Sequence, residues 1–283
     1  MLRRRPPPTT ETLDLEFDLR DAASQMDPSL GIPDQTTESV VVRAKRSVIR
    51  ELRHPAAFLF PLRLFLGIGW LRAFAEKVNS AEWFNGGAVA AFLDSRVSSD
   101  AVAFPLYLQL IEAVLRPGSR WIGWVVMSLQ LLVGLGILLG TYTNLALLIG
   151  IALNANFMLA GQISPSAFYI MIETVLFVTG AGAILGVDGN RVRRQRRASS
   201  LFLVAQPDVR RASHGDKMAV IGLATLAAGL SWFGFAHATD WSPAGGVYDP
   251  GLVFGTVMGL GALSLVILRF RLSALAKPPP LMP

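Results

Sequence analysis

Six polar side chains interrupt segments of this chain that are otherwise apolar enough to enter a lipid bilayer. They are Arg72, Glu76, Gln130, Asn154, Asn156 and Glu173. The guanidinium and amide groups can donate hydrogen bonds to a ligand oxygen, and the carboxyl groups can also exchange protons. An ionisable side chain inside a membrane segment is costly unless it is paired. The six residues therefore predict a polar pocket that binds a quinone or a lipid headgroup, conducts an ion, or only holds helices together.

The first apolar segment, residues 62–78, carries its ionisable side chains on two faces. At about 100° per residue, Arg63, Gly67 and Lys77 share one face of a helix. Arg72 and Glu76 fall near the opposite face, four residues apart, where they can contact each other. We expect the Arg72–Glu76 face to form one wall of the pocket. Arg63 is expected to extend its guanidinium to the headgroups on the inner side of the membrane.

Six apolar segments are predicted to span the membrane and to position these residues. They cover residues 56–76, 121–139, 144–160, 167–187, 218–236 and 251–268. Tight turns join the second, third and fourth segments, so these three are expected to pack as antiparallel neighbours. This arrangement places Asn154, Asn156 and Glu173 in the outer half of the bilayer and Gln130 near its middle. The apolar run 102–115 is too short to span comfortably, and re-entrant and interfacial placements both stay open.

The composition, 52% hydrophobic and 16% charged, indicates a multi-pass membrane protein. Twenty of the 26 Lys and Arg residues fall on one side of the six predicted spans, which predicts that both termini are cytoplasmic. The predicted regions are a disordered cytoplasmic tail (1–40), a basic juxtamembrane helix (41–55), a membrane core (56–190), a basic cytoplasmic loop (191–217), a two-helix membrane hairpin (218–268) and a cytoplasmic tail (269–283).

The chain contains no cysteine, which excludes disulfides, cysteine-ligated iron–sulfur clusters and thiol catalysis. Its three histidines, His54, His214 and His237, lie at or beyond the membrane edges, so no pair is placed to ligate a haem. We expect no metal site and no covalently bound cofactor. The basic residues cluster in the polar segments, as in cytoplasmic loops, so we expect no nucleic-acid partner.

Several short motifs resemble the DoxX/DoxD family. Arg63, Gly67 and Lys77 match the spacing of its opening motif, and the segment around Gln130 resembles its second signature, which usually has Glu at that position. The fourth segment ends in GAILGVDG, which resembles the family's closing GxD motif, with Asp188 as the acid. The resemblance covers about residues 56–190. It implies an all-α polytopic membrane protein with a four-helix DoxX-like bundle, here followed by two further C-terminal transmembrane helices.

The resemblance also implies a function at the bacterial plasma (inner) membrane. Family members include the membrane subunit of thiosulfate:quinone oxidoreductase, so a quinone-linked redox subunit is expected, with quinone as its cofactor. A soluble oxidoreductase or sulfurtransferase is then the expected partner, and a homo-oligomer stays open. Gln130 removes an ionisable group that the family pattern has. A non-enzymatic membrane anchor is the alternative, and a transporter is disfavoured because no inverted repeat is visible.

Overall fold

The computed structural model describes residues 48–49, 51–194, 200–206, 213–242 and 248–274. Residues 1–48 and 49–283 form separate units, and every element named below belongs to the second. The predicted tail 1–40, most of the basic helix 41–55 and parts of the loop 191–217 lie outside the described residues. Within the described part of the chain, every regular element is a helix.

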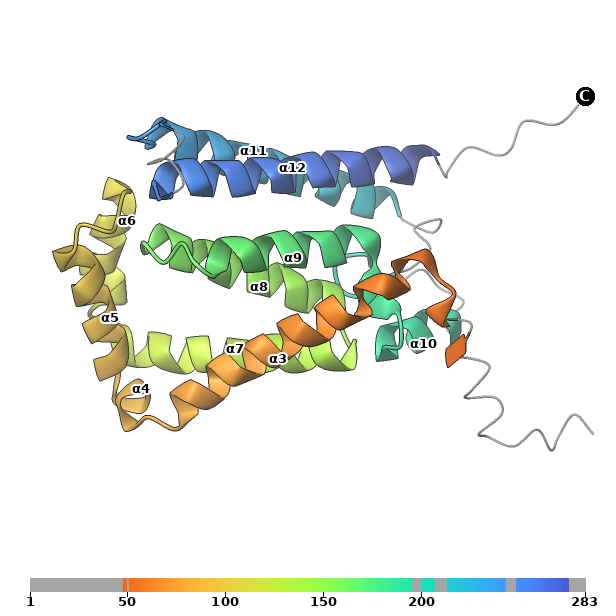
Figure 1. The fold of residues 1–283 in the computed structure, drawn as a ribbon, viewed down its shortest axis with the longest axis horizontal. Coiled ribbons are helices and arrows are strands. Elements are labelled where there is room, and N and C mark those ends of the chain that lie inside the picture. Colours follow the sequence, from red (N-terminus) through yellow and green to blue (C-terminus); the bar gives the residue numbers. More distant parts are fainter. Residues whose placement is uncertain (1–47, 50, 195–199, 207–212, 243–247, 275–283) are drawn as a thin grey trace, which may run out of the picture. The chain divides into compact units, whose positions relative to one another are not determined.

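Six longer helices form the body of this unit (Figure 1). They are α3 (Phe60–Val78), α7 (Ser119–Leu139), α8 (Thr143–Leu159), α9 (Ser166–Thr179), α11 (His214–Ala236) and α12 (Pro250–Ala274). The helix pairs α3–α7, α8–α9 and α11–α12 are in close contact, and α12 also packs on α9. Buried aliphatic and aromatic side chains from α3, α7, α8 and α9 form the core between them.

Four of the predicted spans are long and apolar enough to cross a membrane. They are Pro55–Val78, Ser119–Leu139, His214–Ala236 and Pro250–Leu272. Helices α8 and α9 are apolar but have only 17 and 14 residues. At about 1.5 Å per residue they are shorter than a hydrocarbon core of about 30 Å. Their crossing of the membrane, and hence the count of six spans, stays a prediction.

Three short helices and a π-helical turn follow α3, where the sequence predicted a long connection with one re-entrant or interfacial helix over residues 102–115. They are α4 (Ala81–Asn85), α5 (Gly87–Ser98), α6 (Pro105–Leu110) and the turn Ile111–Leu115. Figure 1 shows them lying across one end of the long helices, which we call the capped end. The left-handed Gly86 (φ 88°) turns the chain between α4 and α5, and Pro105 begins α6. Residues 105–115 thus lie across the helix ends.

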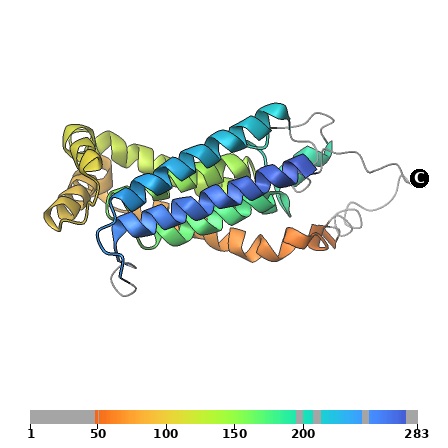
Figure 2. The ribbon, with the colours of Figure 1, turned by 90° about the horizontal axis from the view of Figure 1, so that it is seen from above.

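The C-terminal hairpin is longer at both ends than predicted. Helix α11 begins at His214 because Ser213 and Asp216 form a capping box that satisfies free backbone N–H groups. Helix α12 continues to Ala274, so Arg269 and Arg271 belong to its last turns and not to the tail. Figure 2 shows α11 and α12 side by side along their lengths.

Asp249 stabilises the connection between these two helices from a position just outside the candidate span. Its carboxylate accepts hydrogen bonds from the backbone N–H groups of Thr239, Asp240 and Leu252 and from the Thr239 hydroxyl, at 2.7–3.0 Å. Burial opposes its ionisation, but the four hydrogen bonds outweigh this effect and lower the pKa of Asp249 from 3.8 to about 2.

This lowered pKa predicts an acid-sensitive hairpin. Because the folded-state pKa lies below the unfolded value, the ionised carboxylate stabilises the fold above about pH 4 and loses that effect as the pH falls toward about 2. We expect Asp249→Asn to have a lower thermal unfolding midpoint than the wild type at about pH 6, and the difference to narrow toward about pH 2. The control is Asp94→Asn, which removes an exposed ion pair with Arg116. A difference for Asp249→Asn that does not depend on pH would contradict this account.

Candidate functional site

Glu173 on α9 is the most deeply buried of the six residues predicted to form the pocket. Its carboxyl group is fully buried. The indole Nε1 of Trp70 on α3 donates a hydrogen bond to Oε1 at 3.0 Å. The amide Nδ2 of Asn154 on α8 lies 3.2 Å and 3.4 Å from the two carboxyl oxygens. One carboxyl group therefore joins three helices, and both of its partners are neutral donors.

The backbone of α8 approaches this carboxyl group closely at Gly150. A Cβ atom at position 150 would lie 2.2 Å from Glu173 Oε1 and 2.9 Å from the carboxyl carbon. Real Cβ atoms do not come this close to a neighbour, so residue 150 must be glycine while Glu173 keeps this position. The close approach is typical of membrane helices, where small residues let backbones pack tightly around a polar group.

Gln130 lies on the buried side of α7. It is buried, and its Oε1 has no hydrogen-bond partner among the described residues. Gly134 faces Leu71 of α3, and Gly136 faces Ala146 of α8. Counting along these antiparallel pairs places Gln130 at about the level of Asn154. The predicted level of Gln130 in the membrane stays a prediction, and no hydrogen bond among the described residues joins it to Glu173.

The structure does not bring all six predicted residues into one pocket, which corrects that prediction. Arg72 and Glu76 form an ion pair at 2.8 Å, and their side chains are 78% and 60% exposed. They point away from Glu173 because they lie on the face of α3 opposite Trp70, which is turned into the core. Asn156 is also separate, because it accepts a hydrogen bond from the Tyr107 hydroxyl of α6 at 2.8 Å.

Arg72 and Glu76 instead line an open cleft of about 440 Å³ between α3 and the start of α9. The other lining residues are Phe65, Ile68, Gly69, Ala73, Pro165 and Tyr169. The Tyr169 ring lies 6.3 Å from the rings of both Phe65 and Trp70, measured between centroids. Trp70 also donates a hydrogen bond to Glu173, so the aromatic rings separate the buried carboxyl group from the cleft.

Trp70 and Tyr169 connect the cleft to the carboxyl group, and neither is among the site residues predicted from the sequence. Trp70 follows Arg63 by seven residues, so the same helical period that grouped Arg63 with Gly67 also points it inward. Tyr169 precedes Glu173 by four residues on α9. Both signals were present in the spacing, but nothing in the sequence says which neighbouring helix each ring meets.

Arg63 does not extend to the headgroups, so that prediction is wrong. Its side chain is 1% exposed, and Nη1 donates hydrogen bonds to the carbonyl oxygens of Gly182 and Ile184 at 2.8 and 2.6 Å. Nη2 lies 3.5 Å from the Leu185 carbonyl oxygen. Helix α9 ends at Thr179, so these carbonyl oxygens accept no hydrogen bond from within a helix. The guanidinium of Arg63 bonds them because they are closer to it than a lipid headgroup would be.

Asp188 lies at the same uncapped end of the helices as Arg63 and is also buried. Its carboxylate accepts hydrogen bonds from the backbone N–H groups of Tyr142 and Thr143 at 2.9 and 2.8 Å, where α8 begins. Its own N–H donates to the Gly140 carbonyl oxygen at 2.7 Å. A carboxylate at a helix N-terminus satisfies free donors and complements the helix dipole. Asp188 therefore stabilises the α7–α8 turn.

Two further residues of the family resemblance make packing contacts. The Lys77 ammonium group lies 4.8 Å from the centre of the Trp83 ring and donates a hydrogen bond to the Ala73 carbonyl oxygen. Gly67 faces the Leu138 backbone, where a Cβ atom would come within 3.1 Å. Of the resemblance residues, only Arg63 and Asp188 are brought to the same turn of the chain.

Within the described part of the chain, no group of three or more His, Asp or Glu side chains is placed to hold a metal ion. Comparisons with protein-family models, with curated proteins and with solved structures gave no match for this chain. The chemistry of the site therefore rests on its own residues. These are a cleft with an arginine, an acid and two aromatic rings on its walls, and a buried carboxyl group behind it.

Proposed function

We propose that this protein is the quinone-binding membrane subunit of an oxidoreductase, similar to the DoxX/DoxD proteins. The observation that carries the proposal is the cleft between α3 and α9, in which Arg72 lies beside Phe65 and Tyr169. Quinones are flat rings with carbonyl oxygens, and they bind where an apolar slot offers a few polar groups. Residues 55–78 form an apolar helix of membrane length, so a ligand dissolved in the bilayer can enter the cleft from the side.

Each wall of the cleft has a role in this proposal. The aromatic rings of Phe65 and Tyr169 contact the quinone ring. Arg72 donates a charge-assisted hydrogen bond to one carbonyl oxygen, and Glu76 holds the guanidinium in place. Glu76 is also a carboxyl group at the cleft that can exchange a proton, and Glu173 is a second one behind Trp70.

The redox step takes two electrons and two protons per quinone, which becomes a quinol. The chain contains no cysteine, so the electrons are proposed to come from a soluble oxidoreductase or sulfurtransferase partner, or directly from a small donor. Two thiosulfate ions, the donor that the family resemblance implies, release two electrons when they join as tetrathionate. The carboxyl groups at the cleft and the surrounding water supply the protons.

We also propose that the protein lies in the bacterial inner membrane with both termini in the cytoplasm. The distribution of Lys and Arg along the sequence supports this orientation. With this proposed orientation, the capped end and the cleft would lie in the outer half of the bilayer. A partner or donor would then reach the cleft from the outer side.

The test is quinone binding by the purified full-length protein in detergent, measured by titration with ubiquinone and with menaquinone. We expect Arg72→Ala to weaken binding about tenfold, because it removes a charge-assisted hydrogen bond. The matched control is Arg116→Ala. Arg116 is also an exposed arginine in an ion pair, and it lies between Leu115 and α7, away from the cleft. Equal binding by the two variants, or no binding by the wild type, would overturn the proposal.

A further inference from the structure

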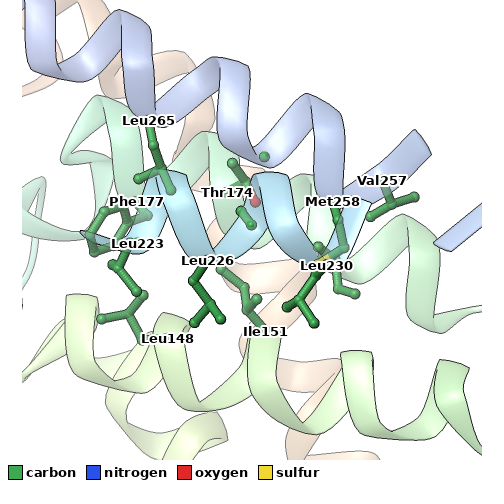
Figure 3. Close-up of a pocket in the computed structure, with 13 residues that line it drawn as sticks. Leu148, Ile151, Thr174, Phe177, Leu223, Leu226, Leu230, Val257, Met258 and Leu265 are labelled. Atoms are coloured by element: carbon green, nitrogen blue, oxygen red, sulfur yellow. The ribbon is translucent and has the colours of Figure 1, made fainter. Parts of the chain in front are cut away.

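A second cavity lies between the core helices α8 and α9 and the C-terminal hairpin, on a different face of α9 from the cleft. Figure 3 shows the side chains that line it. Its volume is about 120 Å³, and the described residues that line it come from four helices. They are Leu148, Ile151, Ile170, Thr174, Phe177, Leu223, Leu226, Ala227, Leu230, Val257, Met258, Gly261 and Leu265. We call this cavity the hairpin groove.

The hairpin groove is elongated and carries no charged side chain. On α11 its lining runs from Leu223 to Leu230, and on α12 from Val257 to Leu265. Seven or eight residues of helix correspond to about 10–12 Å. Both helices are apolar and of membrane length, so the groove lies in the part of the protein that hydrocarbon surrounds. These properties suit a chain-like, uncharged lipid.

Thr174 provides the one oxygen atom among the side chains that line the groove. The residue is only 6% exposed. Threonines elsewhere in these helices, Thr179, Thr225 and Thr256, each donate a hydrogen bond to the carbonyl four residues earlier. Within the described residues, no hydrogen bond involves the Thr174 hydroxyl. The Thr174 residue lines the groove, so its free hydroxyl can form a hydrogen bond with a ligand oxygen there.

The depth of Thr174 restricts which lipid oxygen can reach it. Thr174 shares the groove with Leu226 and Gly261, which lie about halfway along α11 and α12, the two helices of membrane length. The ester and phosphate oxygens of a phospholipid stay at the surfaces of a hydrocarbon core about 30 Å thick. They are therefore too far away, whereas an oxygen carried within the hydrocarbon body of a lipid can reach the middle of the bilayer.

The position of Gly261 shows that the groove has unfilled space on its α12 wall. A Cβ atom added at this glycine would meet no atom within 4 Å, although the residue lines the groove. The packing of α12 on α11 therefore does not require a glycine here, unlike at Gly255, where a Cβ atom would lie 2.8 Å from the Phe235 ring. A ligand bound in the groove would occupy this space.

We propose that the hairpin groove binds an elongated, uncharged lipid that carries one carbonyl or hydroxyl oxygen within its hydrocarbon body. The oxygen bonds to the Thr174 hydroxyl, and the chain lies along α11 and α12. This site is separate from the cleft and does not depend on quinone binding there. It makes the C-terminal hairpin a ligand-binding element.

The test uses two photoreactive probes on the full-length protein in detergent, a long-chain ketone and the matched alkane without the carbonyl. Peptides that contain Leu226 or Met258 are then analysed by mass spectrometry for labelling. We expect the ketone to label these peptides more efficiently than the alkane. Thr174→Val keeps the shape of the side chain, and it should lower ketone labelling about threefold to tenfold without changing alkane labelling.

Two leucine variants separate binding in the groove from contact with the protein surface. Gly261→Leu fills the groove and should remove most labelling by both probes. Gly222→Leu is the matched control, because Gly222 on α11 is also free of atoms within 4 Å but does not line the groove. It should label like the wild type. Equal labelling of the Gly261 and Gly222 variants, or a ketone signal that Thr174→Val does not change, would overturn the proposal.

Discussion

Arg63→Ala is expected to lower the free energy of unfolding by about 3 kcal/mol, which changes the unfolding equilibrium constant roughly a hundredfold. The guanidinium of Arg63 is buried and bonds the carbonyl oxygens of Gly182 and Ile184. Removing it leaves these carbonyls without donors in a region that excludes water, where each unsatisfied group is costly. The measurement is the thermal unfolding midpoint of the purified protein in detergent.

Arg72→Ala is the matched control for stability, because Arg72 is on the same helix but is largely exposed in its pair with Glu76. Exposed ion pairs contribute about 0–1 kcal/mol, so we expect a small change in the unfolding midpoint. Arg63→Lys should fall between the two variants, since an ammonium group keeps the charge but lacks the second nitrogen that reaches toward the Leu185 carbonyl oxygen. Equal destabilisation by Arg63→Ala and Arg72→Ala would show that Arg63 does not hold the end of α9.

Gly150→Val is expected to be about as destabilising, by about 3 kcal/mol, because its Cβ atom would overlap the Glu173 carboxyl group. The carboxyl group must then move and break its hydrogen bonds to Trp70 and Asn154. The unfolding midpoint in detergent again gives the size of the effect. Gly222→Val controls for the general cost of valine in place of a helical glycine, since nothing lies near that position.

A double-mutant cycle shows whether this effect passes through Glu173. Glu173→Ala removes the group with which the new side chain would collide, so Gly150→Val should cost less in that background. We expect the two substitutions to be non-additive by at least about 1 kcal/mol. Additive effects would show that valine at position 150 disturbs the α8–α9 contact without displacing the carboxyl group.

The sequence was most informative about which faces of helices are polar. Spacing along residues 62–78 separated the Arg63 and Gly67 face from the Arg72 and Glu76 face, and the structure buries the first and exposes the second. The groups that each side chain contacts in the folded protein could not be predicted from this spacing. Arg63 bonds carbonyls more than 100 residues away, and no local pattern marks the end of α9 as its partner.

The candidate site was predicted only in part for the same reason. The high cost of an unpaired acid in a membrane singled out Glu173, and Asn154 was correctly placed beside it. Trp70 was not identified as a partner, because an aromatic residue in an apolar helix carries no signal that its N–H group is used. Arg72 and Glu76 were assigned to the same pocket on their expected depth alone, because spacing does not predict which neighbouring helix each face of α3 meets.

The capped end shows a different limit of the sequence. The apolar run 102–115 was predicted to be a re-entrant or interfacial helix and contains α6 and the π-helical turn, whereas α4 and α5 became visible only through their packing. Val89, Leu93 and Phe104 pack in one core cluster with Met158 and Phe254 of the long helices. Such tertiary burial stabilises helices that are too short to persist alone.

The hydrogen bond between Trp70 and Glu173 gives the protein an optical reporter of its own buried acid. The absorption and emission of an indole respond to the electrostatic environment of its N–H group, and this N–H group faces a carboxyl oxygen at 3.0 Å. Trp121 and Trp232, in contrast, are each 76% exposed. A difference spectrum between the wild type and Trp70→Phe therefore isolates one chromophore, and its variation with pH reads the charge of Glu173 directly, without a label or a bound ligand.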